Sequence, residues 1–176
     1  MSEDQEAKFF TKSGILTAQR SGDWIKLNFP IEPDIETIPP EDLLKALGIK
    51  ALYVGKNRFD YIVEVESEQV VRNLEPDLIS IGKMTDRGII LTSISDAKEF
   101  DFVSRFFAPG IGIDEDPVTG SAHCCLGPYW MNRLGKSEFS AYQASTRGGT
   151  VQVKVEGNRV ILGGQAVTVF NGNLLV

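Results

Sequence analysis

Turn signals built on glycine recur through this chain and leave short apolar stretches between them. They lie at 13–14, 21–23, 147–149, 157–158, 163–164 and 171–172. Gly, Asn and Asp adopt the backbone conformations that tight hairpin turns require, so this spacing predicts short, mostly antiparallel strands. The predicted strands cover residues 8–12, 15–20, 24–29, 50–55, 60–65, 88–94, 99–106, 138–145, 150–155, 159–162, 166–169 and 173–175. Such a chain is restricted to folds in which a sheet dominates.

One stretch breaks this pattern with the spacing of a long helix. Apolar residues recur every three or four positions between residues 122 and 134. Pro128 lies inside the stretch, and because an interior proline removes a backbone hydrogen bond, we expect a bend there. Shorter helices are predicted over 41–47, from Ser67 onwards and over 77–81. Many short strands around one long helix, without regular βαβ alternation, predict the α+β class.

Four prolines between residues 30 and 40 predict a linker, because proline lacks the N–H donor that helices and sheets need. The expected organisation follows from this break. It comprises an acidic tail over 1–7, a hairpin segment over 8–30, the proline-rich linker over 31–40, the main domain over 41–166 and a final strand over 167–176 that can pack with the hairpin segment.

The composition excludes several functional classes. The chain has 18 Lys and Arg against 24 Asp and Glu, a formal charge of −6, and no local basic patch. Neither nucleic acid nor a membrane surface is therefore expected as a partner. The first residues, MSEDQEA, lack the apolar segment of a secretory signal, and no apolar run approaches the roughly 20 residues that cross a bilayer. We expect a cytoplasmic protein.

The chain holds a single histidine, His123, and two cysteines, Cys124 and Cys125. Neighbouring cysteines cannot join distant segments by a disulfide, and one histidine does not suffice for a typical His and Cys metal centre. Free cysteine is most often a small buried hydrophobic residue, so we expect both thiols to be packing residues. His123 can either donate to a ligand from the first helical turn or serve in packing or capping.

Polar groups converge in the sequence DEDPVTGS, which precedes the long helix. A helix N-terminus offers free N–H groups and a positive dipole end, so it can bind a carboxylate or phosphate. Thr119, Gly120 and Ser121 would form that cradle. Asp116 could hydrogen-bond a ligand or exchange a proton with it. In a purely structural alternative, Asp116 is the N-cap and Pro117 the first helical residue.

Residues 100–130, FDFVSRFFAPGIGIDEDPVTGSAHCCLGPYW, resemble the signature of the phenazine biosynthesis PhzF-like family. In that family, EDPVTGSAH follows a strand ending in RFFAP and opens the helix of the C-terminal domain. The resemblance continues, in the family's order, through 134–136, the STRGG sequence at 145–149 and residues 163–166. The opening hairpin resembles the end of the family's first domain. We therefore expect this chain to correspond to the C-terminal part of the family.

The resemblance implies a diaminopimelate epimerase-like fold, in which a curved antiparallel-rich sheet or barrel surrounds a central helix. It also implies an isomerase that shifts a proton on a small carboxylic acid without a metal or an organic cofactor. By resemblance, Asp116 is a substrate-facing catalytic residue, and Thr119, Gly120 and Ser121 bind the substrate. A homodimer, or pairing with another chain of the family, is expected.

The family's catalytic glutamate and its GHATLA-like segment have no counterpart in these 176 residues. The resemblance accordingly implies that this chain alone does not complete the isomerase reaction. The alternative is a non-catalytic relative that binds small acids or oligomerises.

Overall fold

One continuous mixed sheet organises the computed structural model, which describes residues 6–12, 14–170 and 172. Within these residues it contains eleven strands in the order β1-β2-β3-β11-β10-β9-β8-β7-β6-β5-β4. They are β1 (Glu6–Thr11), β2 (Gly14–Ser21), β3 (Trp24–Pro30), β4 (Ile35–Glu36), β5 (Tyr53–Lys56), β6 (Asp60–Glu64), β7 (Gly88–Ile94), β8 (Phe102–Phe107), β9 (Glu138–Gln143), β10 (Gly149–Glu156) and β11 (Arg159–Gly164). Strand β6 pairs with β7, and β8 with β9, in parallel. The sheet does not close into a barrel, because β1 and β4 remain its two edges among the described residues.

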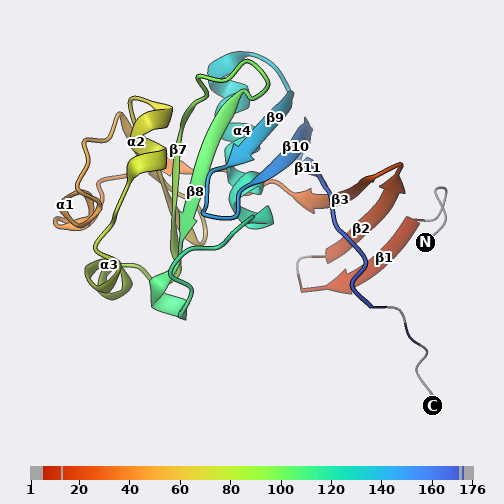
Figure 1. The fold of residues 1–176 in the computed structure, drawn as a ribbon, viewed down its shortest axis with the longest axis horizontal. Coiled ribbons are helices and arrows are strands. Elements are labelled where there is room, and N and C mark those ends of the chain that lie inside the picture. The colour runs from red at the N-terminus through yellow and green to blue at the C-terminus, as the bar shows by residue number, and fades with distance from the viewer. Residues whose placement is uncertain (1–5, 13, 171, 173–176) are drawn as a thin grey trace.

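Helices cover this sheet, and the longest of them lies within its curve (Figure 1). They are α1 (Leu43–Leu47), α2 (Glu68–Asn73), α3 (Leu78–Met84) and α4 (Gly120–Leu134), with a 3₁₀ turn η1 (Pro109–Ile111). The Ser67 hydroxyl oxygen accepts a hydrogen bond from the Val70 amide and so caps α2. Helix α4 ends at Gly135, whose left-handed backbone (φ 66°) suits glycine. The α+β class is confirmed, and no helix among the described residues is long and apolar enough to cross a bilayer.

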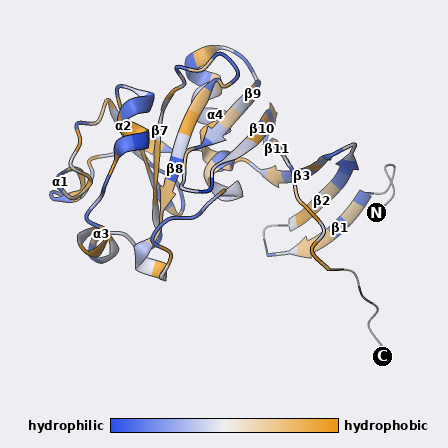
Figure 2. Cartoon of the chain, in the orientation of Figure 1, coloured by the Kyte–Doolittle hydropathy of each residue, from blue (hydrophilic) through white to orange (hydrophobic). Residues whose placement is uncertain are grey.

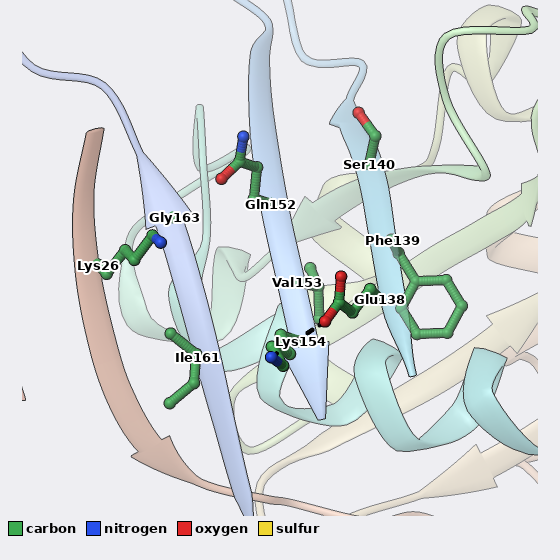
Figure 3. Close-up of a pocket in the computed structure, with 9 residues that line it drawn as sticks. All are labelled: Lys26, Glu138, Phe139, Ser140, Gln152, Val153, Lys154, Ile161 and Gly163. Atoms are coloured by element: carbon green, nitrogen blue, oxygen red, sulfur yellow. Dashed lines mark ion pairs between the residues drawn. The ribbon is translucent and has the colours of Figure 1, made fainter. Parts of the chain in front are cut away.

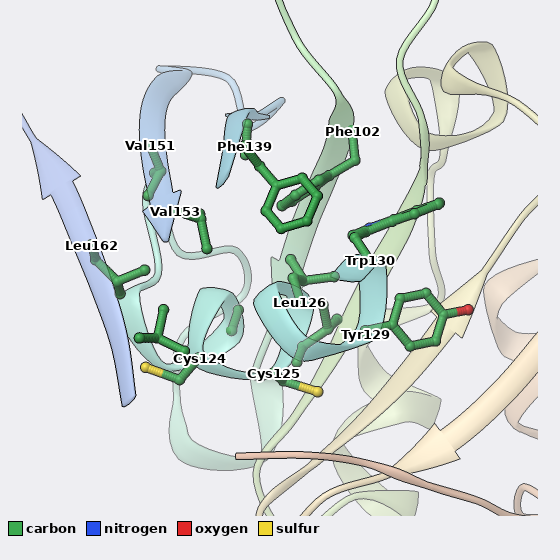
Figure 4. Close-up of a cluster of buried hydrophobic side chains, with 14 of the residues drawn as sticks. Phe102, Cys124, Cys125, Leu126, Tyr129, Trp130, Phe139, Val151, Val153 and Leu162 are labelled. Atoms are coloured by element: carbon green, nitrogen blue, oxygen red, sulfur yellow. The ribbon is translucent and has the colours of Figure 1, made fainter. Parts of the chain in front are cut away.

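The inner core forms between α4 and the concave face of the sheet (Figure 4). Trp130 is 1% exposed, stacks on the Phe102 ring at a centroid distance of 5.7 Å, and donates from Nε1 to the Thr92 hydroxyl at 3.1 Å. Cys124 and Cys125 are buried in the same cluster as free thiols. Their predicted packing role is therefore confirmed.

A second core lies on the opposite face, under the three short helices. It joins Leu43, Leu47, Val71 and Ile81 from those helices to Val63, Leu91, Val103 and Phe107 from the sheet. Strands β6, β7 and β8 consequently bury both faces, and they read in the sequence as nearly continuous apolar runs. This double covering fixes the central strands on which α4 is seated.

Several expected elements differ from the structure. Residues 166–169 form no strand, although their alternation predicts one, and the predicted strand at 173–175 lies outside the described residues. The proline-rich segment contains the short edge strand β4, which pairs with β5. Helix α4 begins at Gly120 and runs through Pro128 as one helix. Strand β3 of the predicted hairpin segment pairs with β11 of the predicted main domain. The domain boundaries themselves stay a prediction.

Candidate functional site

The chain enters α4 through a turn at residues 114–119 that is held by side chains far away in the sequence. The N-cap of α4 is Thr119, not Asp116, so the structural alternative in which Asp116 caps the helix is wrong. The Thr119 hydroxyl donates to Asp116 Oδ2 at 2.5 Å, and the Asp116 amide donates to the Phe106 carbonyl at 3.0 Å. Asp116 is half-buried, one turn before the free amides at the start of α4.

Gln143, at the end of β9, is the clamp of this turn. It is fully buried, and its Oε1 accepts from the Thr119 amide at 2.8 Å. Its Nε2 donates to the Asp116 carbonyl at 2.7 Å and to the Thr119 hydroxyl oxygen at 3.1 Å. Because Thr119 accepts from Gln143, its own hydroxyl hydrogen is committed to the Asp116 carboxylate. The sequence offered no local signal for Gln143, since it lies 24 residues after Thr119.

The STRGG sequence braces the same turn from the other side. The Ser145 hydroxyl donates to the Pro117 carbonyl at 2.8 Å and accepts from the Gly148 amide at 3.1 Å. A Cβ at Gly149 would lie 2.4 Å from Val118 Cγ2, so any larger residue there would force the Val118 side chain to shift. The two segments that carry the family resemblance are thus in direct contact.

Gly120 and Ser121, the first two residues of α4, directly follow the turn. Gly120 is exposed, and a Cβ at this position would meet only Leu162 Cδ1, at an ordinary contact distance of 3.7 Å. The packing of the described residues therefore does not require glycine at position 120. A glycine without a packing reason leaves its backbone open to close approach by a ligand. Ser121 is half-buried, and its Oγ lies 2.6 Å from an Arg87 guanidinium nitrogen.

Arg87 and Asp60 are site neighbours that sequence reasoning missed. Arg87 Nη1 lies 3.0 Å from Asp60 Oδ2, while Asp60 Oδ1 is buried without a hydrogen-bond partner among the described residues. Burial raises the pKa of Asp60 to about 6 against the opposing charge of Arg87. Arg87 and Asp60 lie 34 and 61 positions before Ser121 in the sequence, and the parallel pairing of β6 with β7, in which Asp60 lies opposite Gly88, brings the two residues together.

Three other titratable groups near the turn are not free to act there. Glu115 receives two hydrogen bonds from the Arg105 guanidinium, at 2.6 and 3.2 Å. His123 is fully buried and places Nδ1 2.8 Å from the Thr119 carbonyl, and desolvation lowers its pKa to about 4. His123 therefore packs in the interior and does not reach a ligand. Burial raises the pKa of Cys124 to about 12, so this thiol is a poor base.

A surface hollow elsewhere shares no residue with this turn. Its volume is about 480 Å³, and it lies on the outer side of β3, β11, β10 and β9 (Figure 3). The ion pair of Lys154 with Glu138, at 3.0 Å, crosses it. Among residues 6–12, 14–170 and 172, no group of three or more His, Cys, Asp or Glu could hold a metal ion. The expectation that no cofactor takes part stays a prediction.

Comparison with known proteins shows which family this chain is similar to. The model of the phenazine biosynthesis-like protein family matches residues 3–172. An uncharacterized isomerase of Halalkalibacterium halodurans is 54% identical over 177 residues, which cover 100% of this chain and 67% of that protein. A crystal structure of a PhzF family protein from Enterococcus faecalis has a TM-score of 0.86 and 35% identity, and the match covers 94% of this chain and 63% of that chain.

A more distant structure shares the fold. It is a predicted epimerase from Pseudomonas aeruginosa, with a TM-score of 0.60 and 16% identity over 97% of this chain and 69% of that chain. The chain spans about two thirds of the length of the relatives that it matches. The family match runs along nearly the whole chain, so the expectation of a C-terminal part alone is not borne out. The fold, the DPVTGS turn and these matches together show that the chain belongs to the phenazine biosynthesis-like protein family.

Proposed function

We propose that the turn at 116–121 binds the carboxylate of a small acid as part of a cofactor-independent isomerase. The observation that carries the proposal is Gly120, which is exposed, begins α4 and has no packing reason to be glycine. Backbone amides at this helix start can receive the carboxylate oxygens, and the helix dipole favours the negative charge. The similar protein of Halalkalibacterium halodurans is named an isomerase, which supports this reaction class.

In this proposal each site residue has one task. The Ser121 hydroxyl and the first amides of α4 hold the carboxylate, while Thr119 keeps the Asp116 carboxylate oriented through its 2.5 Å hydrogen bond. Asp116 holds or exchanges a proton at the substrate. A base removes a proton from one carbon of the acid, and the proton returns at another position, so the composition of the acid is unchanged. The base is proposed to come from another segment or chain, because Glu115 is bound to Arg105 and His123 is buried.

Deuterium incorporation tests the reaction. The intact mass of the natural protein is measured first, so that the assay uses the protein at its natural length. It is then incubated in ²H₂O with lactate, aspartate or but-3-enoate, each of which carries a C–H bond that a proton shift can labilise. We expect deuterium in at least one acid by mass spectrometry. Asp116→Asn should reduce the rate by about 100-fold or more, the usual size of a general acid–base contribution.

The control variant is Asp77→Asn, which changes an aspartate that caps α3, outside the site. It should leave the exchange rate unchanged. Absence of exchange in all three acids, with folded protein at its natural length, would argue against the isomerase. Binding of an acid by calorimetry without any exchange would instead favour the non-catalytic alternative, a small-acid-binding member of the family.

We also propose that a second copy of this chain covers the hairpin β1–β2. Hydrophobic side chains are exposed on this hairpin and on the segment after β11. Figure 2 colours parts of both segments as hydrophobic. They include Phe9, Phe10, Ile15, Val167, Val169 and Phe170. Among the described residues, strand β1 is also an edge of the sheet, and an edge strand can pair with another chain. Sedimentation velocity should show a dimer that the paired substitution Phe10→Ser and Val169→Ser weakens, and a monomer at 100 times the concentration used for folding studies would refute it.

A further inference from the structure

Arg87 connects the proposed carboxylate site to a buried acid. It precedes β7, and 27% of its side chain is exposed. One guanidinium nitrogen lies 3.0 Å from Asp60 Oδ2, and another donates to Ser121 Oγ at 2.6 Å. The Phe59 and Phe106 rings flank the guanidinium, with centroids 5.0 and 5.8 Å away. These contacts hold the guanidinium at the first turn of α4.

The direction of the bond between Arg87 and Ser121 is fixed by chemistry. A guanidinium carries five N–H donors and no acceptor, so Ser121 Oγ must accept. The hydroxyl hydrogen of Ser121 is then left to donate elsewhere. Two of the five Arg87 donors are bound to described side chains, which leaves further donors for an anion beside Ser121. The pair therefore presents hydrogen-bond donors at the start of α4, where the amides are donors too.

We propose that Arg87 sets the specificity of this site, because it makes Ser121 a donor and so selects a carboxylate over a neutral amide or an amine. This inference rests on the proposed function. Asp60 is the positioning residue: it is 1% exposed, and a buried carboxylate needs the partner that Arg87 supplies. Arg87 thus cannot swing freely to solvent, and its donors stay oriented toward the turn.

Matched ligands test this specificity. The protein at its natural length is titrated calorimetrically with benzoate, lactate and but-3-enoate, and separately with benzamide, lactamide and but-3-enamide. Each acid and its amide have nearly the same shape, but the amide presents donors where the acid has a second acceptor. We expect at least one acid to bind about tenfold more tightly than its amide, as charge-assisted hydrogen bonds predict.

The variants separate selectivity from folding. Arg87→Met alone would leave the Asp60 carboxylate buried and unpaired, so the test variant is Arg87→Met combined with Asp60→Asn, which removes both charges. It should weaken acid binding about tenfold and leave amide binding within about twofold. Adding Ser121→Ala to this variant should weaken acid binding less than Ser121→Ala does alone, because Arg87 and Ser121 act on the same carboxylate through one hydrogen-bond network. The matched control is Arg58→Met, which removes another guanidinium beside the Phe59 ring but one that pairs with Glu32.

The outcomes discriminate between the two proposals. An unchanged preference for the acid in the folded double variant would overturn the role of Arg87 and leave the proposed function standing. An equal loss for acid and amide would also overturn it, because a purely structural role affects both ligands alike. If the unaltered protein binds none of the three acids at millimolar concentration, the proposed function itself fails, and the inference fails with it.

Discussion

The inner core around α4 and the β1–β2 hairpin belong to the same sheet, but they bury their side chains very differently. Trp130 is 1% exposed, whereas Phe10 of β1 is 84% exposed. The hairpin nevertheless has a complete ladder, with six register pairs from Glu6↔Gln19 to Thr11↔Gly14. Backbone pairing is thus equally regular in both regions, and only the covering by α4 distinguishes them. Regular strand pairing in this fold therefore does not by itself bury the side chains of the paired strands.

Truncating a core side chain should sharpen this contrast most. Trp130→Ala leaves a cavity beside Phe102 and removes the hydrogen bond that the Thr92 hydroxyl accepts, while that hydroxyl still donates to the Val103 carbonyl. We expect the unfolding free energy to fall by about 3–5 kcal/mol. Urea denaturation followed by circular dichroism measures the change. Trp130→Phe is the control, because it keeps an aromatic ring but loses the hydrogen bond, and it should cost clearly less. Equal losses in the two variants would mean that the hydrogen bond, and not the cavity, dominates.

The pH dependence of stability should also arise in α4, from His123. Burial holds the pKa of His123 at about 4, while an unfolded histidine titrates near 6.5. Between these values the unfolded chain binds a proton that the folded chain does not, so stability falls as the pH falls from about 6.5 to about 4. A difference of this size corresponds to about 3 kcal/mol at the lower limit.

Asp60 opposes this trend and provides the control. Burial raises its pKa from 3.8 to about 6, so the folded chain keeps a proton that the unfolded chain has released. Stability from this group falls as the pH rises from about 4 to about 6. Asp60→Asn should therefore make the loss of stability on acidification steeper. Adding His123→Asn should flatten the curve between pH 5 and 6.5, and a persistent slope there would show that another group titrates.

Two glycines with left-handed backbones allow a matched test of smaller size. Gly148, beside the α4 turn, has φ 69°, and a Cβ there would lie 2.0 Å from the Tyr142 hydroxyl oxygen. Gly22, between β2 and β3, has φ 59° and no atom within 4 Å of such a Cβ. Gly22→Ala should cost about 1 kcal/mol from backbone strain alone, and Gly148→Ala about 2 kcal/mol. Equal thermal denaturation midpoints for both variants would show that Tyr142 moves aside without cost.

The distinction between forming a strand and burying it also explains what could be predicted from the sequence. Turn glycines and alternation predicted β1, β2 and β3 well, and the DPVTGS sequence located the start of α4 to within two residues. Residues 166–169 alternate in the same way but form no strand, and none of the strands in the described part of the chain pairs with them. A local sequence pattern indicates which secondary structure a segment favours, but it does not indicate which strand the segment pairs with.

Long-range contacts account for the rest of the site. Gln143 reaches the Thr119 amide from 24 residues away, and Arg87 reaches Ser121 from 34. Neither residue stands in a motif, and both are brought to the turn by strand pairing across the sheet. The sequence therefore located the turn itself, whereas its clamp and its charged neighbour required the fold.

The smallest effect should come from the hairpin. Phe10→Ala removes a side chain that is 84% exposed, so the unfolding free energy of the dilute protein should change by less than about 0.5 kcal/mol. Repeating the urea titration at 100-fold higher protein concentration tests whether a second copy covers this face, because association with the folded state adds stability that rises with concentration. The unaltered protein should then gain stability and Phe10→Ala should gain less. A loss of several kcal/mol in dilute solution would mean that Phe10 is buried within a single chain, and the contrast with Trp130 would disappear.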